Sequence, residues 1–171
     1  GSWTAPTSAP TAVSVTPSSG SGATQTFSFL FSDAGGASKI TYIQGLINGS
    51  FAWQNACAVL YYQDSNTIYL VLDSGTGWQG PLTVGQAGTL QNSQCTLNAG
   101  ASSVSAVGNN LTVNAALTFK PAFIGSKTVL LGAEDIANSL SSGWQSRGSW
   151  AVQNPAPVLS SISPGSIVAT S

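Results

Sequence analysis

Residues 26–32 read TFSFLFS, and this stretch decides the fold class. Phe27, Phe29 and Phe31 occupy every second position, so their rings point to one side of an extended chain. Residues 111–120, LTVNAALTFK, alternate in the same way. A strand with one apolar face needs a second layer to cover that face. The pattern therefore predicts sheets that pack face to face.

Further strands are predicted wherever a short apolar run is bounded by Gly, Asn, Ser or Pro. Tight hairpin connections are expected at 63–67 and 108–110. No segment carries a sustained helical period, and no apolar stretch is long enough to insert into a membrane. The predicted fold is an all-β, antiparallel β-sandwich of immunoglobulin-like or jelly-roll type with about ten strands. The remaining strands are expected at 12–16, 38–47, 56–63, 66–72, 89–97, 102–107, 126–134 and 147–153.

Composition divides the chain into three parts. Residues 1–11 form a linker, residues 12–153 form the β-sandwich domain, and residues 154–171 form a second linker with an orphan strand. VSVTPS at 13–18 is echoed by LSSISPGS at 159–166, so a strand start recurs where another domain would begin. The orphan strand either opens a following module or donates itself to the sheet edge of a neighbour. The donor-strand candidates are Val158, Leu159 and Ile162.

Charged residues make up only 5% of the 171 residues, and the net charge is -1. A typical soluble domain has about 25% charged residues. The surface must therefore consist mainly of Ser, Thr, Asn, Gln and Gly. Such a surface has no basic patch for nucleic acid or anionic lipid, so we expect neither as a partner.

Catalytic chemistry has little support in the sequence. The chain has no histidine, which excludes Ser-His and Cys-His nucleophile systems. Glu134 and Asp135 are the only adjacent acids, and neighbours on a strand point to opposite faces, so a carboxylate pair is not expected. We predict a protein that is not an enzyme and has no metal site or cofactor. Two alternatives stay open. One is calcium at Asp33, Glu134 and Asp135, and the other is an isopeptide bond to an Asn from Lys39, Lys120 or Lys127.

Two glycine-flanked Trp-Gln pairs, GWQ at 77–79 and at 143–145, are the candidate recognition features. In a loop, a large aromatic ring serves either as a lid on the core or as an exposed binding platform. Aromatic faces stack on the apolar faces of sugars, while Asn and Gln bond to hydroxyl groups. Trp150, two residues before Val152, is expected in the core. The candidates for glycan binding or subunit contact are Trp78, Trp144, Tyr62 and Trp53.

Cys57 and Cys95 are the two cysteines of the chain. An even count in a charge-poor, Ser/Thr-rich sequence indicates an oxidising compartment. A bridge would close a loop of about 38 residues, which the chain-entropy model values at about 4 kcal/mol. Two buried free thiols are the alternative. Metal binding by this pair is not expected, because no third soft ligand exists.

Several stretches resemble known modules. These are AVSVTPSSGSGATQTFSFLFSDAGGAS, NACAVLYY, LQNSQCTL and SSGWQSRGSWAV, with PVLSSISPGSIVATS at the end. The first four resemble a poorly characterised β-sandwich domain that recurs in large secreted proteins of soil bacteria such as the Acidobacteria. The last resembles the first strand of an IPT/TIG immunoglobulin-like module. The resemblance implies an extracellular, modular setting and a Cys57–Cys95 bridge, and it names no ligand.

Two functional hypotheses follow. The first is a non-catalytic structural or adhesive subunit, secreted or at the cell surface, that forms a link in a multidomain array or a self-assembling fibre. Its partners would be copies of itself or neighbouring modules, contacted through the termini. The alternative is a carbohydrate-binding module that holds a polysaccharide on exposed Trp and Tyr rings.

Overall fold

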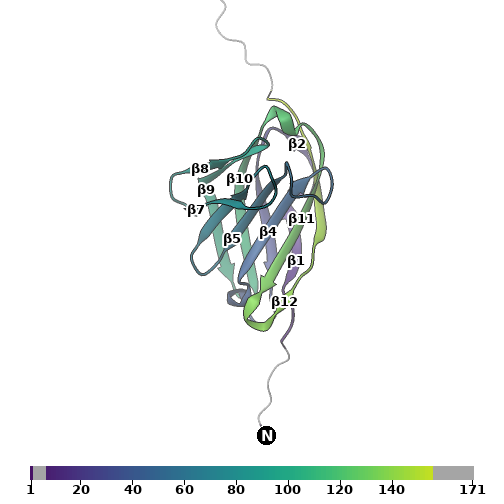
Figure 1. The fold of residues 1–171 in the computed structure, drawn as a ribbon. Helices are drawn as coiled ribbons and strands as arrows, with labels where there is room; N and C mark the ends of the chain where they lie inside the picture. The colour runs from purple at the N-terminus through teal and green to yellow at the C-terminus, as the bar shows by residue number, and fades with distance from the viewer. Residues whose placement is uncertain (2–6, 156–171) are drawn as a thin grey trace, which may run out of the picture.

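The computed structural model describes residue 1 and residues 7–155. These residues form two β-sheets packed face to face, joined by turns and short 3₁₀ segments (Figure 1). The predicted antiparallel β-sandwich is confirmed, with thirteen strand segments in the described residues. In the same part of the chain, no helix is long and apolar enough to cross a membrane. The predicted donor strand lies outside the described residues.

The smaller sheet has five strands in the order β1-β3-β10-β9-β8, all antiparallel. It contains both stretches with the clearest alternation, which pair with each other as β3 and β10. Its strands are β1 (Thr11–Thr16), β3 (Thr24–Ser32), β8 (Thr89–Gln91), β9 (Cys95–Val107) and β10 (Asn110–Phe119).

The larger sheet has the order β2-β13-β11-β4-β5-β6-β7, with β12 pairing β11. Its members are β2 (Ser21–Gly22), β4 (Tyr42–Asn48), β5 (Cys57–Tyr62), β6 (Thr67–Val71), β7 (Trp78–Thr83), β11 (Gly125–Asp135), β12 (Leu140–Ser141) and β13 (Gln145–Val152). Three single-turn 3₁₀ segments, η1 (Ala37–Lys39), η2 (Pro121–Phe123) and η3 (Ile136–Asn138), connect the strands.

The core lies between the two sheets and is dominated by the rings of β3. Phe27 and Phe29 stack with centroids 6.2 Å apart, and Trp150 stands edge-on to Phe27 at 5.3 Å. Trp150 is 5% exposed, as the sequence predicts for a core residue. A Cβ atom at Gly45 of β4 would lie 2.8 Å from the Phe29 ring, so the close packing of the sheets at this point requires glycine.

Three local predictions were wrong. The expected strand 38–47 begins only at Tyr42, because Ala37–Lys39 forms η1. The separate strands expected at 89–97 and 102–107 are instead the short β8 and one long β9. The first GWQ pair, expected in a loop, instead begins strand β7 at Trp78, and Gly80–Pro81 interrupts the alternation of this strand.

The chain enters and leaves the sandwich at opposite ends of its long axis (Figure 1). β1 starts at one end in the smaller sheet, and the chain then crosses to the larger sheet. There residues 18–22 run parallel to β13, with N–H groups of Ser149, Ala151 and Gln153 donating to backbone carbonyls of this segment. This pairing closes one side of the sandwich.

Candidate functional site

Three tryptophans meet on the outer face of the larger sheet. Trp53 lies between the other two, with ring centroids 5.7 Å from Trp78 and 5.4 Å from Trp144. We call Trp53, Trp78 and Trp144 the tryptophan row. Phe51 extends this row, since its ring lies 5.6 Å from that of Trp144 and is 58% exposed. The predicted candidates Trp53, Trp78 and Trp144 are therefore brought together.

The tryptophan row covers a small apolar cluster that is separate from the core. Leu46, Ala58 and Val71 are buried beneath the indoles and lie at one level across β4, β5 and β6. The indoles themselves are half-buried. Each ring thus combines the two roles that the sequence left open, because it covers the sheet and keeps part of its surface in water.

The loop of Trp53 packs tightly against the turn that precedes Trp78. Gly75 has a φ of +74°, and a Cβ atom there would lie 2.6 Å from the backbone nitrogen of Gln54. Only glycine permits this approach. From the other side, the side-chain nitrogen of Asn48 donates to the carbonyls of Ala52 and Gln54 at 2.8 and 3.3 Å. These contacts fix the position of Trp53 next to Trp78.

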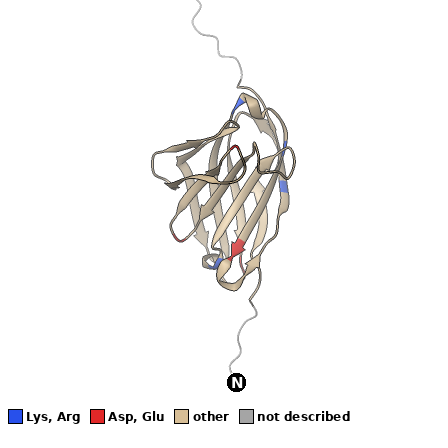
Figure 2. Ribbon diagram, in the orientation of Figure 1, with Lys and Arg blue, Asp and Glu red and all other residues tan. Residues whose placement is uncertain are grey.

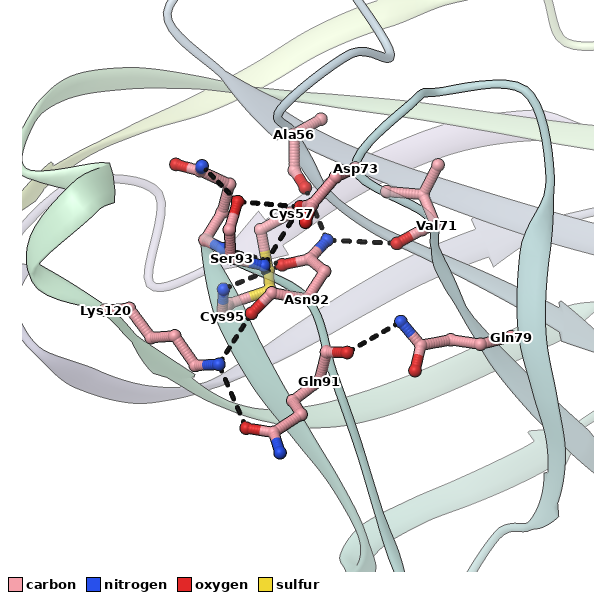
Figure 3. The surroundings of a disulfide bond; sticks show 11 residues. Ala56, Cys57, Val71, Asp73, Gln79, Gln91, Asn92, Ser93, Cys95 and Lys120 are labelled. Carbon is pink, nitrogen blue, oxygen red and sulfur yellow. Dashed lines mark hydrogen bonds between the residues drawn. A yellow bond between two sulfur atoms is a disulfide. The ribbon is translucent and has the colours of Figure 1, made fainter.

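A buried amide holds the same loop from inside the sandwich (Figure 3). Asn92, 8% exposed, donates to the carbonyls of Ala56 and Val71 at 2.9 and 3.0 Å. Its side-chain oxygen accepts from the backbone nitrogens of Gln94 and Cys95 at 2.9 Å each. All of its hydrogen-bonding groups are thereby used, so Asn92 joins the β8–β9 turn to the loop of Trp53 and to the strand beside Trp78.

The predicted disulfide lies next to this amide (Figure 3). Cys57 of β5 and Cys95 of β9 form a bond of 2.01 Å that links the two sheets, which confirms the predicted pairing and rules out free thiols. Both cysteines are fully buried. A bond of this kind is typical of proteins that fold in an oxidising compartment.

A hollow of about 260 Å³ opens beside the row. It is lined by Trp53, Trp78, Gln44 and residues 75–77. Within the described residues, the side-chain amide of Gln44 has no hydrogen-bond partner, so it is available to a ligand. No charged residue occurs in β4, β5, β6 or β7, and Figure 2 shows red only near the far end of β11 and at loop tips on this face.

Three tyrosines form a second aromatic group on the same face. The ring of Tyr62 lies 5.3 Å from that of Tyr42 and 5.9 Å from that of Tyr69. We call Tyr42, Tyr62 and Tyr69 the tyrosine row. Burial raises the pKa of Tyr42 above its ordinary value, and the nearby Glu134 carboxylate and Tyr62 add to the rise. The predicted candidate Tyr62 thus belongs to this row and not to the tryptophan row.

Four of the five carboxylates accept hydrogen bonds from nearby residues, while Oδ2 of Asp33 is buried without a partner among the described residues. Asp33 accepts from the backbone of Gly35 at 2.8 Å, Asp135 from that of Asn138 at 3.2 Å, and Asp73 from that of Ser93 at 2.9 Å. A second hollow, at one end of the sandwich, includes Asp64 beside Thr41 and Gln63. Across residues 7–155, no three acids or cysteines gather in a way that could hold a metal ion.

Sequence reasoning missed Gln44, Phe51, Tyr42 and Tyr69. A signal existed for three of them, because Tyr42 and Gln44 alternate with the inward-facing Ile43. Tyr69 lies between the inward-facing Ile68 and Leu70 and also points outward. Which outward residues of different strands become neighbours depends on the register. A single strand pattern does not fix that register.

No protein-family model, curated protein or solved structure matches this chain. A sandwich fold by itself supports many unrelated functions. The function must therefore be argued from the chemistry of the outer face.

Proposed function

We propose that the chain is a non-catalytic, adhesive module of a secreted protein that binds a neutral polysaccharide on its outer aromatic face. One observation carries the proposal: Trp53 and Trp78 border an uncharged hollow in which the Gln44 amide has no partner among the described residues. Aromatic walls and an unpaired amide are the groups that recognise a sugar ring, through its C–H face and its hydroxyls.

The electrostatics of the face support a neutral ligand. A charged polymer would find no counter-charge along β4 to β7 and would lose hydration without compensation. A sugar chain without charges has no such cost. Contact through rings and amides would also be insensitive to salt.

A purely structural role for the row explains less. Aliphatic side chains would cover Leu46, Ala58 and Val71 equally well and would leave no ring surface in water. Phe51, more than half exposed at the edge of the row, covers little of the sheet. Exposed contiguous aromatic surface of this kind typically marks a binding site.

The direct test is a pull-down of the whole purified chain on insoluble cellulose, chitin and xylan. We expect retention on at least one of them, and about tenfold weaker binding for Trp78→Ala. Val107→Ser is the matched control, since Val107 is 72% exposed on the other sheet. Absence of binding to every neutral polysaccharide would refute the proposal.

A second candidate function, a link in an extracellular array or fibre, is supported by the arrangement of the chain ends. Because the chain enters and leaves at opposite ends, copies joined in sequence extend in a line (Figure 1). The edge strands give weaker support to strand donation, because β2 and β8 are short and β7 contains Pro81. Within the described residues, longer open edges are offered by β1 and by residues 100–107 of β9, which extend beyond β8.

Electron microscopy of the purified chain tests this second candidate. Filaments that disappear when residues 155–171 are deleted would support donation by Val158, Leu159 and Ile162. Isolated particles for both the full and the shortened chain would refute self-assembly. The glycan-binding proposal would be unaffected, because its residues lie on the face and not at the ends.

A further inference from the structure

The two aromatic rows lie on one sheet face at different levels along the strands. The tryptophan row covers the level of Leu46 and Ala58, which are cross-strand partners. The tyrosine row includes Tyr42 and Tyr62, which are also cross-strand partners. Tyr42 and Leu46 are four positions apart in β4, which corresponds to about 13 Å along the strand. The rows are therefore spaced along the strand direction and not across it.

A further level lies between that of Leu46 and that of Tyr42, and it includes Tyr69 of the tyrosine row. Gln44 pairs with Leu60 of β5, and Leu60 pairs with Tyr69 of β6. At this level the Gln44 amide, which has no partner among the described residues, and the Tyr69 ring are open to a ligand, while Leu60 is buried. An extended ligand that leaves the hollow at Trp78 would pass over Gln44 before it reaches Tyr62.

We infer that the ligand is a straight, ribbon-like chain of β-1,4-linked neutral sugars that lies along β4–β6 and is held at both rows. This inference rests on the proposed function and adds a second subsite, formed by Tyr42, Tyr62 and Tyr69. In such a polymer the equatorial linkages keep successive ring faces on the flat sides of a straight ribbon. Rows separated along one sheet face match that shape, whereas an α-1,4-linked chain coils away from a flat surface.

The tyrosine end also sets a preference against acidic sugars. Glu134 is close enough to Tyr42 to raise its pKa, and Asp64 lies in the turn just after Tyr62. Both carboxylates would repel a uronic acid bound at this subsite. We therefore expect xylan, cellulose or chitin fragments to bind and polygalacturonate fragments not to bind.

Calorimetric titration with oligosaccharides of increasing length tests the inference. Cello-, xylo- and chito-oligosaccharides from the disaccharide to the hexasaccharide are the probes, and malto-oligosaccharides are the α-linked comparison. We expect affinity in one β-linked series to rise about tenfold once the oligosaccharide spans both rows. Tyr62→Ala should abolish this gain and leave the affinity for the shortest bound fragment unchanged. Trp78→Ala should weaken all lengths.

Tyr62→Phe keeps the ring and should retain the length dependence, so it separates stacking from a general disturbance of the sheet. Thermal unfolding of each variant verifies that it folds. Equal affinity for short and long fragments, or a preference for malto-oligosaccharides, would overturn the two-row inference and leave glycan binding intact. If the unaltered chain bound no neutral oligosaccharide or polysaccharide, both proposals would fail.

Discussion

The inner core and the tryptophan row use similar residues in different ways. Phe27, Phe29 and Phe31 are completely buried between the sheets. Trp53 and Trp78 lie on the outside of one sheet and keep part of each ring in water. The core rings contribute to folding only, because no ligand can reach them. Folding buries only part of each outer ring, and the exposed part of the ring is available to a ligand.

The largest expected effect is the difference in stability loss between two tryptophan substitutions, one in the core and one in the tryptophan row. Trp150→Ala removes a buried ring whose Nε1–H donates to the Gly22 carbonyl, so the free energy of unfolding should fall by about 5 kcal/mol. Trp78→Ala removes a half-buried ring and should cost about 1 kcal/mol. Denaturant titration measures both. Equal losses would show that the tryptophan row is as structural as the core.

Removal of the disulfide should have the second-largest effect on stability. It closes a loop over a sequence separation of 38 residues. Replacing Cys57 and Cys95 together by Ala should lower the free energy of unfolding by about 4 kcal/mol, because the unfolded chain gains freedom. Denaturant titration of the oxidised chain and the double variant gives the difference. A loss below 1 kcal/mol, which is typical of a surface substitution, would contradict the claim that the disulfide stabilises the fold by constraining the unfolded chain.

Asn92 connects the two regions, and its removal should affect both. Asn92→Ala leaves two carbonyls and two N–H groups without their partner, so we expect a loss of about 3 kcal/mol. Glycan binding should weaken as well, because the loop of Trp53 loses its inner support. The exposed Asn98, whose side-chain oxygen accepts from the backbone of Ala101 at 3.2 Å, is the control, and Asn98→Ala should cost no more than about 1 kcal/mol. Unchanged binding in Asn92→Ala would show that Asn48 and Gly75 position Trp53 without it.

The smallest effect concerns pH. The raised pKa of Tyr42 means that folding favours its neutral phenol, so its contribution is complete below the unfolded value of 10.0 and is lost as pH rises through the folded-state pKa. Burial and Asp64 raise the pKa of Tyr61 in the same direction, while burial lowers that of Lys127 and opposes them. Tyr42→Phe should therefore make the alkaline fall in Tm shallower. An identical pH profile for Tyr42→Phe would contradict this.

The sequence predicts the fold well where the alternation is regular. The stretches around Phe29 and Val113 form β3 and β10, and the connections at 63–67 and 108–110 are hairpin turns. β7 could not be predicted in the same way, because Pro81 breaks the alternation and strand pairing with β6 overrides that local signal.

The site is less predictable than the fold. Trp53, Trp78 and Trp144 can be singled out as exposed candidates, yet they come from three segments far apart in the chain. Their contact depends on the order β11-β4-β5-β6-β7, which no local pattern encodes. The tyrosine row depends in the same way on the register that places Tyr42 opposite Tyr62.

The parallel pairing of residues 18–22 with β13 determines how the domain would bear tension. Pulling the two chain ends apart drives these segments past each other along their length. The three hydrogen bonds from Ser149, Ala151 and Gln153 are then strained together and not broken one after another. A domain joined to neighbours through both chain ends would therefore resist unravelling when those ends are pulled apart.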